Sequence, residues 1–367
     1  MKWIVLTSLF WVFSFLVSCK HAEAQSIFES FDVKDELIQV KGANYIFRND
    51  GMLSFSRFSE ATLNAPVNEA MFNADKARTN SGIRLFINTN SSKLRLTFKA
   101  LNGINRGAEF AVYQNGKQSS VFTFKGEKAK TEMVFEVDNE RGHEASLFEI
   151  SMPSLANVGL VKLELIKGAD LLPVPHEKQA VYLAIGNSIT HGVGQGSATF
   201  LTYPYLLAKS KNWDFYNLAV GGAKISPAIA RMTSEMPKAD VITILIGYND
   251  LMFNDKSPEA FAEAYLRYLK TIRHHQPNAE IYCITLTHTR AVANDRTGVK
   301  PEAFRMALKH LVYQLQSEGD TRLHLVKGQD ISSEANLRAD VISDKVHFSI
   351  EGAALFAKAL YELVKVN

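Results

Sequence analysis

The sequence predicts an all-β sandwich-like domain followed by an α/β domain with a parallel sheet. Between about residues 26 and 170, short segments alternate apolar and polar residues, which is typical of strands with one buried face. After Pro173-Val174-Pro175, apolar strands alternate with helical patterns, which is typical of a parallel sheet covered by helices. We therefore expect a β-sandwich domain at residues 26–172 and an α/β domain at residues 178–367, joined by a stiff linker.

The composition supports two globular domains and excludes several classes of protein. The chain has 367 residues, of which 46% are hydrophobic and 22% charged, with a net charge of +3. This hydrophobic content excludes wholesale disorder, and the length exceeds that of one ordinary domain. A nearly neutral chain without a basic stripe or an acidic tail predicts no nucleic-acid partner. The two cysteines, Cys19 and Cys283, cannot form a disulfide framework or a zinc cluster.

Residues 1–24 resemble an export signal. Met1 and Lys2 precede an apolar run over residues 3–17, which suits a signal-peptide core and is shorter than the roughly 20 residues of a membrane span. Two cleavage patterns stay open: residues 16–19 resemble a bacterial lipobox ending at Cys19, and residues 22–24 match ordinary signal cleavage. Both predict an exported protein: periplasmic, secreted, or an outer-membrane lipoprotein whose membrane contact is a lipid anchor at Cys19. The short run disfavours an uncleaved membrane anchor.

The first domain is predicted from its strands and turns. Residues 94–99, 133–137 and 161–165 alternate apolar and polar side chains, and helical periodicity is largely absent from this half. Asp50-Gly51 and Asn115-Gly116 lie between such segments and predict hairpin turns. Many short strands favour a β-sandwich or jelly roll. Its aromatic residues are expected to fill the core, with sugar stacking as the alternative: Phe55, Phe58, Tyr113 and Phe122.

The second domain is predicted from five strands and five helices in alternation. The strands are expected at residues 180–185, 214–220, 241–246, 281–286 and 323–326. The helices are expected near residues 200–209, 226–235, 258–275, 301–317 and 350–364. In an open parallel sheet, binding sites form at the carboxyl ends of the strands, so the residues that follow each strand are the candidates.

A serine, a histidine and an aspartate occupy such positions. Ser188 follows the first strand, and Asp344 and His347 come just before the last helix. A serine hydroxyl is a weak nucleophile that needs a base, and histidine can accept its proton at neutral pH. An aspartate can hold the imidazole in the right tautomer. This arrangement predicts a catalytic triad of Ser188, His347 and Asp344.

Three groups could form an oxyanion hole beside that serine. The backbone N–H groups of Ser188 and Gly222 and the side-chain amide of Asn249 all follow predicted strands. Each motif is weak by itself, because serine caps helices and Gly-Gly forms turns, but the set in this order favours catalysis. An α/β-hydrolase elbow is disfavoured by Thr190 in place of its last glycine. The absence of a His-Glu-x-x-His motif argues against zinc hydrolysis, so no metal and no cofactor are predicted.

The sequence segments that contain these residues form four blocks, which resemble the signature blocks of the SGNH (GDSL-type) hydrolases over residues 178–367. The blocks contain, in order, Ser188, Gly222, Asn249, and His347 with Asp344. The resemblance implies a flavodoxin-like three-layer α/β/α fold and ester hydrolysis through an acyl-serine intermediate without metal. This chain departs from the family's Gly-Asp-Ser pattern by having Gly186-Asn187-Ser188, a change in the loop that leaves the nucleophile in place.

The substrate is predicted by analogy. A β-sandwich before such a domain is similar to carbohydrate esterases, such as jelly-roll-containing acetyl-xylan esterases, which often lack the triad acid that is present here as Asp344. We therefore expect removal of O-acetyl groups from an acylated carbohydrate, with Tyr248, His288 and Arg290 as candidate substrate contacts. Two alternatives stay open: a lipid or peptidoglycan O-acyl esterase, and a non-catalytic glycan-binding protein of the bacterial envelope.

Overall fold

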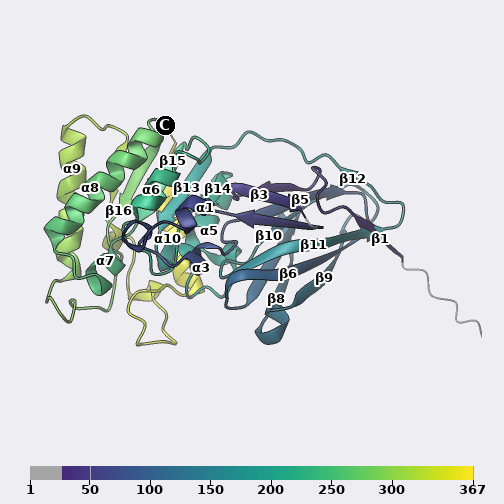
Figure 1. The fold of residues 1–367 in the computed structure, drawn as a ribbon, viewed down its shortest axis with the longest axis horizontal. Helices are drawn as coiled ribbons and strands as arrows, with labels where there is room; N and C mark the ends of the chain where they lie inside the picture. The colour runs from purple at the N-terminus through teal and green to yellow at the C-terminus, as the bar shows by residue number, and fades with distance from the viewer. Residues whose placement is uncertain (1–26, 50, 367) are drawn as a thin grey trace, which may run out of the picture.

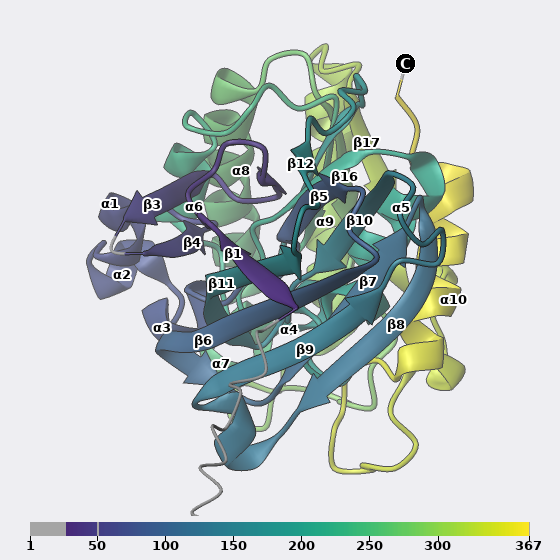
Figure 2. The same cartoon turned by 90° about the vertical axis from the view of Figure 1, so that its right-hand side faces the viewer.

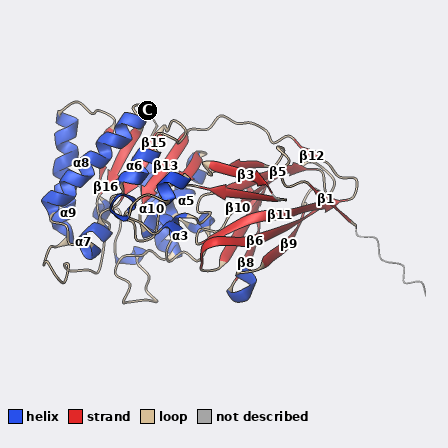
Figure 3. Cartoon of the chain, in the orientation of Figure 1, coloured by secondary structure: helices blue, strands red, loops and turns tan. Residues whose placement is uncertain are grey.

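The computed structural model describes residues 27–49 and 51–366. Figure 1 shows two domains side by side along the long axis of the molecule, and Figure 3 shows that strands dominate one domain and helices the other. No helix within the described ranges is both long enough and apolar enough to cross a bilayer. The predicted signal sequence at residues 1–24, including Cys19, lies outside the described residues, so export stays a prediction from the sequence.

The first domain consists of two six-stranded antiparallel sheets. One sheet contains β1 (Phe28–Phe31), β3 (Tyr45–Asn49), β4 (Met52–Ser56), β6 (Lys93–Asn105), β9 (Glu132–Asp138) and β11 (Ala156–Ile166). The other contains β2 (Gln39–Lys41), β5 (Arg84–Thr89), β7 (Ala108–Gln114), β8 (Lys117–Phe124), β10 (Ser146–Ser151) and β12 (Leu171–Leu172). A 3₁₀ turn, η1 (Gly126–Ala129), lies between β8 and β9.

The sandwich core lies between these two sheets. Strand β9 alternates exposed and buried residues along its whole length, because its inward side chains pack on the other sheet. Phe98, Phe110 and Phe135 pack against one another in this core, with the rings of Phe98 and Phe135 stacked. The turn between β7 and β8 places Asn115 at φ +48° and Gly116 at φ +85°, the left-handed backbone that an Asn-Gly hairpin needs. The all-β prediction for this half is confirmed in its overall form.

Three short helices interrupt the sandwich where the sequence analysis expects none. They are α1 (Glu60–Leu63), α2 (Val67–Ala70) and α3 (Ala74–Ala77). Each has four residues, too few for a helical period to be visible in the sequence. The side chains of Ser59 and Asn73 cap α1 and α3 by accepting from the backbone N–H groups of Thr62 and Lys76. The segment contacts α6 of the second domain.

The second domain contains a five-stranded parallel sheet in the order β14-β13-β15-β16-β17. Its strands are β13 (Val181–Gly186), β14 (Asp214–Asn217), β15 (Val241–Leu245), β16 (Glu280–Ile284) and β17 (Leu323–Val326). In chain order this is 2-1-3-4-5, the flavodoxin-like order that the resemblance implies.

Helices cover this sheet on both faces. Figure 2 shows α5 and α10 on one side and α6 and α8 on the other. The helices are α4 (Ser188–His191), α5 (Tyr203–Lys211), α6 (Pro227–Met232), α7 (Tyr248–Phe253), α8 (Pro258–His275), α9 (Pro301–Ser317) and α10 (Ile350–Leu363). Three 3₁₀ turns complete the domain: η2 (Thr199–Leu201), η3 (Gly328–Asp330) and η4 (Glu334–Asn336). The predicted three-layer α/β/α fold is confirmed.

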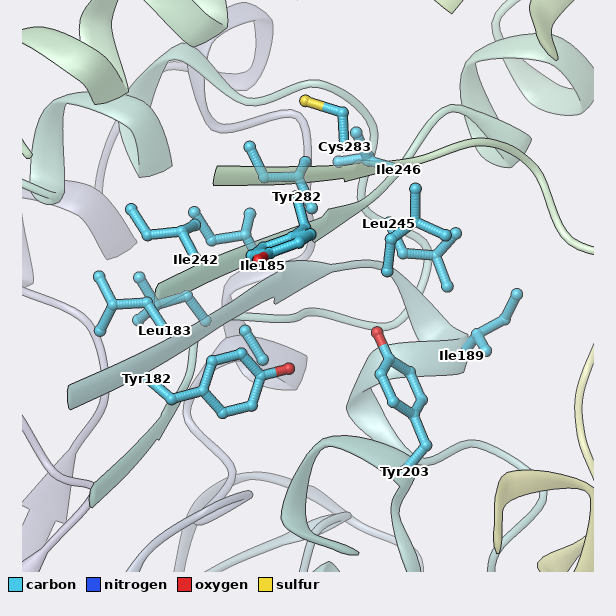
Figure 4. Close-up of a cluster of buried hydrophobic side chains, with 14 of the residues drawn as sticks. Tyr182, Leu183, Ile185, Ile189, Tyr203, Ile242, Leu245, Ile246, Tyr282 and Cys283 are labelled. Carbon is cyan, nitrogen blue, oxygen red and sulfur yellow. The ribbon is translucent and has the colours of Figure 1, made fainter. Parts of the chain in front are cut away.

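The core of the second domain is built on the central strands (Figure 4). Side chains of β13 and β15, including Leu183 and Ile242, are fully buried because both faces of a parallel sheet carry helices. Tyr182 is also buried, and its hydroxyl bonds to that of Thr243 at 2.7 Å. Cys283 lies in this core as a free thiol, and burial raises its pKa to about 12, which keeps the thiol protonated at neutral pH.

The two domains share a packed interface. Phe58 and Tyr113 belong to the sandwich half of the chain but pack with the core of the second domain. Phe55 packs inside the sandwich, and the partly buried Phe122 packs against the same core. All four aromatic residues therefore pack in a hydrophobic core, as expected, but Phe58 and Tyr113 join the core of the second domain. Arg57 is also buried at this interface, where its guanidinium donates to backbone carbonyls of both domains.

Candidate active site

Ser188, His347 and Asp344 form a continuous hydrogen-bonded chain. Ser188 Oγ lies 2.8 Å from His347 Nε2, although the two residues are 159 positions apart. His347 Nδ1 lies 2.9 Å from both carboxylate oxygens of Asp344. Because an ionised carboxylate can only accept, Nδ1 carries the imidazole proton and Nε2 is left to accept from the serine hydroxyl. The structure therefore brings together the three residues that the sequence analysis predicts as the triad, with Ser188 placed to lose its proton.

The ends of two secondary-structure elements position the three residues of the triad. Ser188 is the first residue of α4, directly after β13, and the side chain of Asn187 caps the helix by accepting from the N–H of Ile189 at 3.1 Å. An aspartate would offer the same acceptor, so the departure from Gly-Asp-Ser keeps the capping hydrogen bond. His347 lies just before α10, whose N-cap is Ser349.

The pKa of Asp344 is lowered. Burial acts to raise this pKa, but the carboxylate accepts from the backbone N–H groups of His347 and Val346 and faces the imidazole of His347. Arg338 adds a positive charge 3.6 Å from the second carboxylate oxygen. These interactions keep Asp344 ionised at neutral pH, as a residue that stabilises an imidazolium must be.

The three predicted oxyanion donors lie around one pocket with Ser188 and His347, which we call the catalytic pocket. It has a volume of about 230 Å³ and is lined by Ser188, Gly222, Asn249 and His347, among others. Ser188 begins a helix, where backbone N–H groups lack an intrahelical acceptor. Gly222 has φ +85°, a left-handed conformation that favours glycine. Asn249 Nδ2 donates to the carbonyl of Ala223 at 2.9 Å and keeps a second N–H for a ligand.

His191 supports the loop that carries Gly222. Its Nδ1 accepts from the backbone N–H of Gly221 at 2.9 Å, and its Nε2 lies 2.8 Å from the hydroxyl of Thr79 in the first domain. Burial, with the charge of Arg57 nearby, lowers the pKa of His191 well below its usual value. His191 is therefore neutral, with its proton on Nε2. It connects the first domain to the loop around Gly221 and Gly222, which we call the oxyanion loop.

Replacing His191 with leucine is expected to lower kcat for a neutral aryl ester by about 10- to 100-fold, somewhat less than the loss of one oxyanion donor. Leucine leaves the N–H of Gly221 without an acceptor, so the neighbouring Gly222 N–H loses its orientation. His191→Gln, which retains a donor and an acceptor, should recover part of the rate. Steady-state kinetics with matched thermal unfolding curves would measure this. Equal losses in both variants at unchanged stability would contradict the positioning role.

A buried carboxylate fixes the same loop at a second point. Asp250 is fully buried, and its carboxylate accepts from the N–H of Ile225 at 3.1 Å and from Lys256 at 2.7 Å. Burial raises the pKa of Asp250, while the charge of Lys256 opposes that rise. The loop that carries Gly222 is thus held at Gly221 by His191 and at Ile225 by Asp250.

The three candidate substrate contacts do not line the catalytic pocket. Tyr248 is buried at the start of α7. His288 is partly exposed and lies 3.4 Å from Glu334. Arg290 also pairs with Glu334 and donates to the carbonyl of Asp344 at 2.9 Å, so it supports the loop that carries the triad acid. The structure therefore gives two of these side chains partners within the protein.

The first domain supplies pocket residues that the sequence analysis misses. Lys76, Ile104, Arg106 and Leu155 line the catalytic pocket together with Ser188. They come from α3, the end of β6, the loop after it and the loop before β11. No motif connects these positions to the second domain. The capping asparagine at position 73 is the one local signal that would have indicated a helix there.

The glycine-rich segment after α4, residues 192–196, packs against the loop that carries His347. Gln195 in its centre is fully buried, and its side-chain amide donates to the carbonyl of Phe348 at 2.8 Å. Gly194 has φ +98°, and a Cβ there would lie 2.5 Å from that carbonyl. The segment is thus packed tightly against the residue after His347, and its glycines permit this close approach.

The chemistry of the site rests on the side chains and backbone N–H groups described above. Among residues 27–49 and 51–366, no three His, Cys, Asp or Glu side chains lie together in a way that could hold a metal ion. A nucleophile, its base, an orienting acid and convergent N–H donors together can add a hydroxyl to a carbonyl carbon and stabilise the resulting oxyanion.

Comparisons with known proteins agree with this geometry. Residues 184–355 match the GDSL-like lipase/acylhydrolase family. A search of curated protein sequences found no match. Among solved structures, the chain is similar to the salicylyl-acyltransferase SsfX3 from a tetracycline biosynthetic pathway. The TM-score is 0.77 at 20% identity, over 93% of this chain and 99% of that one.

Two carbohydrate esterases of family two also share the fold. The enzyme from Clostridium thermocellum, solved with cellohexaose, has a TM-score of 0.66 at 16% identity and covers 89% of this chain and 98% of its own. The enzyme from Cellvibrio japonicus has a TM-score of 0.64 at 18% identity and covers 92% of this chain and 96% of its own. At these identities the likeness shows a common two-domain fold.

Proposed function

Because residues 184–355 match the GDSL-like lipase/acylhydrolase family, we propose that this protein is a serine esterase that works through an acyl-Ser188 intermediate. The observation that carries the proposal is the hydrogen-bonded chain from Ser188 Oγ through His347 to Asp344, at 2.8 and 2.9 Å. It opens onto a pocket with three candidate oxyanion donors.

The geometry supports a two-step reaction. His347 Nε2 accepts the proton of Ser188 as Oγ attacks the ester carbonyl carbon, and Asp344 stabilises the imidazolium. The N–H groups of Ser188, Gly222 and Asn249 bind the oxyanion, each contributing on the order of 3 kcal/mol to lowering the barrier. When the intermediate collapses, His347 gives its proton to the leaving alcohol. The same histidine then deprotonates a water molecule that attacks the acyl-serine, which releases the acid and restores the Ser188 hydroxyl.

We propose that the substrate is an O-acetylated carbohydrate. Two observations support a short acyl group and a sugar: the pocket has a volume of only about 230 Å³, and the chain shares its two-domain fold with carbohydrate esterases. A lipid or peptidoglycan O-acyl esterase is the alternative.

Hydrolysis rates on aryl esters from acetyl to octanoyl are expected to be highest for acetyl, because a catalytic pocket of about 230 Å³ favours a short acyl group. The fall in kcat/KM from acetyl to octanoyl should be at least about tenfold. Each rate is corrected with Ser188→Ala protein, which shares every feature except the nucleophile. A rate that rises toward octanoyl would favour the lipid esterase, and rates that Ser188→Ala does not change would overturn the esterase proposal.

A further inference from the structure

Two cationic side chains of the first domain line the catalytic pocket. Lys76 lies in α3, and Arg106 follows β6. The ammonium group of Lys76 lies beside the oxyanion loop, since a Cβ built on Gly222 would be 3.6 Å from Lys76 Nζ. A positive charge contributed by one domain therefore lies next to the reacting centre of the other.

Neither cation has a partner of opposite charge. Within the described part of the chain, the ion pairs and side-chain hydrogen bonds of the protein do not include Lys76 Nζ or the guanidinium of Arg106. The residues that line the catalytic pocket include no aspartate and no glutamate. Arg84, by contrast, also reaches from the first domain to the second but pairs there with Asp214 at 2.9 Å.

The two charges also act on each other. Burial and the charge of Arg106 both lower the pKa of Lys76. The charges of both residues, with that of Arg57, act in the same direction on the buried His191. Two adjacent cations without counter-charges destabilise the free protein, and a bound anion would relieve this repulsion. An ion pair or hydrogen bond within the fold does not account for them, because their charged groups form neither among the described residues.

We infer that the catalytic pocket selects esters that carry a carboxylate close to the ester carbonyl, and that Lys76 and Arg106 bind this carboxylate. The inference rests on the proposed esterase function and deepens it by naming a substrate class. Guanidinium and ammonium groups bind carboxylates through charge-assisted hydrogen bonds, which are stronger than neutral ones. The carboxylate could belong to the acyl half, as in a dicarboxylic acid half-ester, or to the alcohol half, as in an acetylated uronic acid.

Paired substrates separate these two sources. One pair is 4-nitrophenyl hydrogen succinate and its neutral methyl ester, for the acyl half. The other is an O-acetylated methyl glucuronoside and its uncharged amide, for the alcohol half. The measured quantity is the ratio of kcat/KM for the anionic substrate to that for the neutral one, in protein with the native residues, Lys76→Gln and Arg106→Gln. Lys270→Gln, which removes an exposed cation on α8 that forms no ion pair among the described residues, is the matched control.

In one of the two pairs, we expect the ratio to exceed one and to fall about tenfold in Lys76→Gln and in Arg106→Gln, the loss of one hydrogen bond to a charged group. Lys270→Gln should leave the ratio unchanged. Salt at 0.5 M should reduce it, as screening requires. A ratio near one in both pairs, or equal losses on anionic and neutral substrates in the variants, would overturn the inference.

A binding measurement keeps this result separate from the fate of the esterase proposal. Calorimetric titration of Ser188→Ala protein with monomethyl succinate and with methyl glucuronoside does not require turnover. We expect one of them to bind at least about tenfold more weakly when Lys76 is also glutamine. Binding that is insensitive to Lys76 and Arg106 overturns the anion site even in an active esterase. Sensitive binding in a protein with no Ser188-dependent hydrolysis overturns the esterase instead.

Discussion

Ser188→Ala is expected to lower kcat on 4-nitrophenyl acetate by at least about 10⁴-fold, because removing the nucleophile of a triad abolishes the acylation route. Stability should hardly change, since Ser188 Oγ has His347 as its only hydrogen-bond partner among the described residues. Burst and steady-state kinetics of purified protein measure the loss. Ser234→Ala removes an exposed hydroxyl that bonds only to a nearby carbonyl, and it serves as the control with an unchanged rate.

The acid of the triad gives a graded version of the same test. Asp344→Asn should keep the loop geometry but present an amide to His347 Nδ1, which favours the wrong imidazole tautomer. We expect a loss of about 10³- to 10⁴-fold in kcat with little change in KM. A variant of either residue that retains more than a tenth of the rate would contradict the catalytic assignment.

Arg57→Leu is expected to lower the free energy of unfolding by at least about 3 kcal/mol, since a buried side chain with several hydrogen bonds is replaced by one with none. The guanidinium donates to the carbonyls of Asn217 and Ala219 at 2.7 and 2.9 Å, and to that of Thr79 at 2.7 Å. Burial lowers the pKa of Arg57 to about 9, so the group is charged at neutral pH. Activity should fall with stability, because Ala219 lies just before the oxyanion loop.

Chemical denaturation with activity measured in parallel tests this effect. Arg267→Leu is the matched control, since Arg267 is exposed on α8 and pairs only with Glu263 one turn away. Such a surface pair contributes less than about 0.5 kcal/mol. Arg57→Lys should recover only part of the stability, because an ammonium group cannot reach carbonyls on both sides. If Arg57→Leu unfolded like Arg267→Leu, the interface would not depend on the buried guanidinium.

Much of the second domain could be predicted from the sequence because its signals are local. The helices at residues 258–275 and 301–317 have the predicted bounds, since each begins with proline and repeats its apolar residues over more than four turns. The carboxyl ends of the strands could be placed to within three residues, and parallel topology brings these ends together at one edge of the sheet. Ser188, Gly222 and Asn249 therefore lie around one pocket although they are far apart in the chain.

The contribution of the first domain could not be predicted, because it depends on contacts between domains. Nothing around Arg57 in the sequence indicates burial, and charged residues are usually exposed. Lys76 lies in a four-residue helix without a readable period, and its position beside Gly222 exists only in the folded protein. Phe58 and Tyr113 look like sandwich core for the same reason: apolar character indicates burial but not which core the residue joins.

Arg290 illustrates a different limit. It follows a strand of the second domain, where substrate contacts are common, and the sequence therefore predicts it as a substrate contact. Its guanidinium instead pairs with Glu334 and donates to the carbonyl of Asp344. Sequence position indicates that a side chain is near the site. Whether it faces substrate or holds the loop behind the triad depends on partners that lie 44 and 54 positions further along the chain.

The most direct test of acyl-serine catalysis is covalent labelling with a fluorophosphonate ester, followed by peptide mass spectrometry. Such a reagent phosphonylates an activated serine, with fluoride as the leaving group and the serine proton passing to the base. We predict one added group per chain, on the peptide that contains Ser188. The label should appear at the same rate as esterase activity is lost, and His347→Ala protein should stay unlabelled. An enzyme that keeps its activity after Ser188 is fully labelled, or loses it through a label elsewhere, would contradict the account.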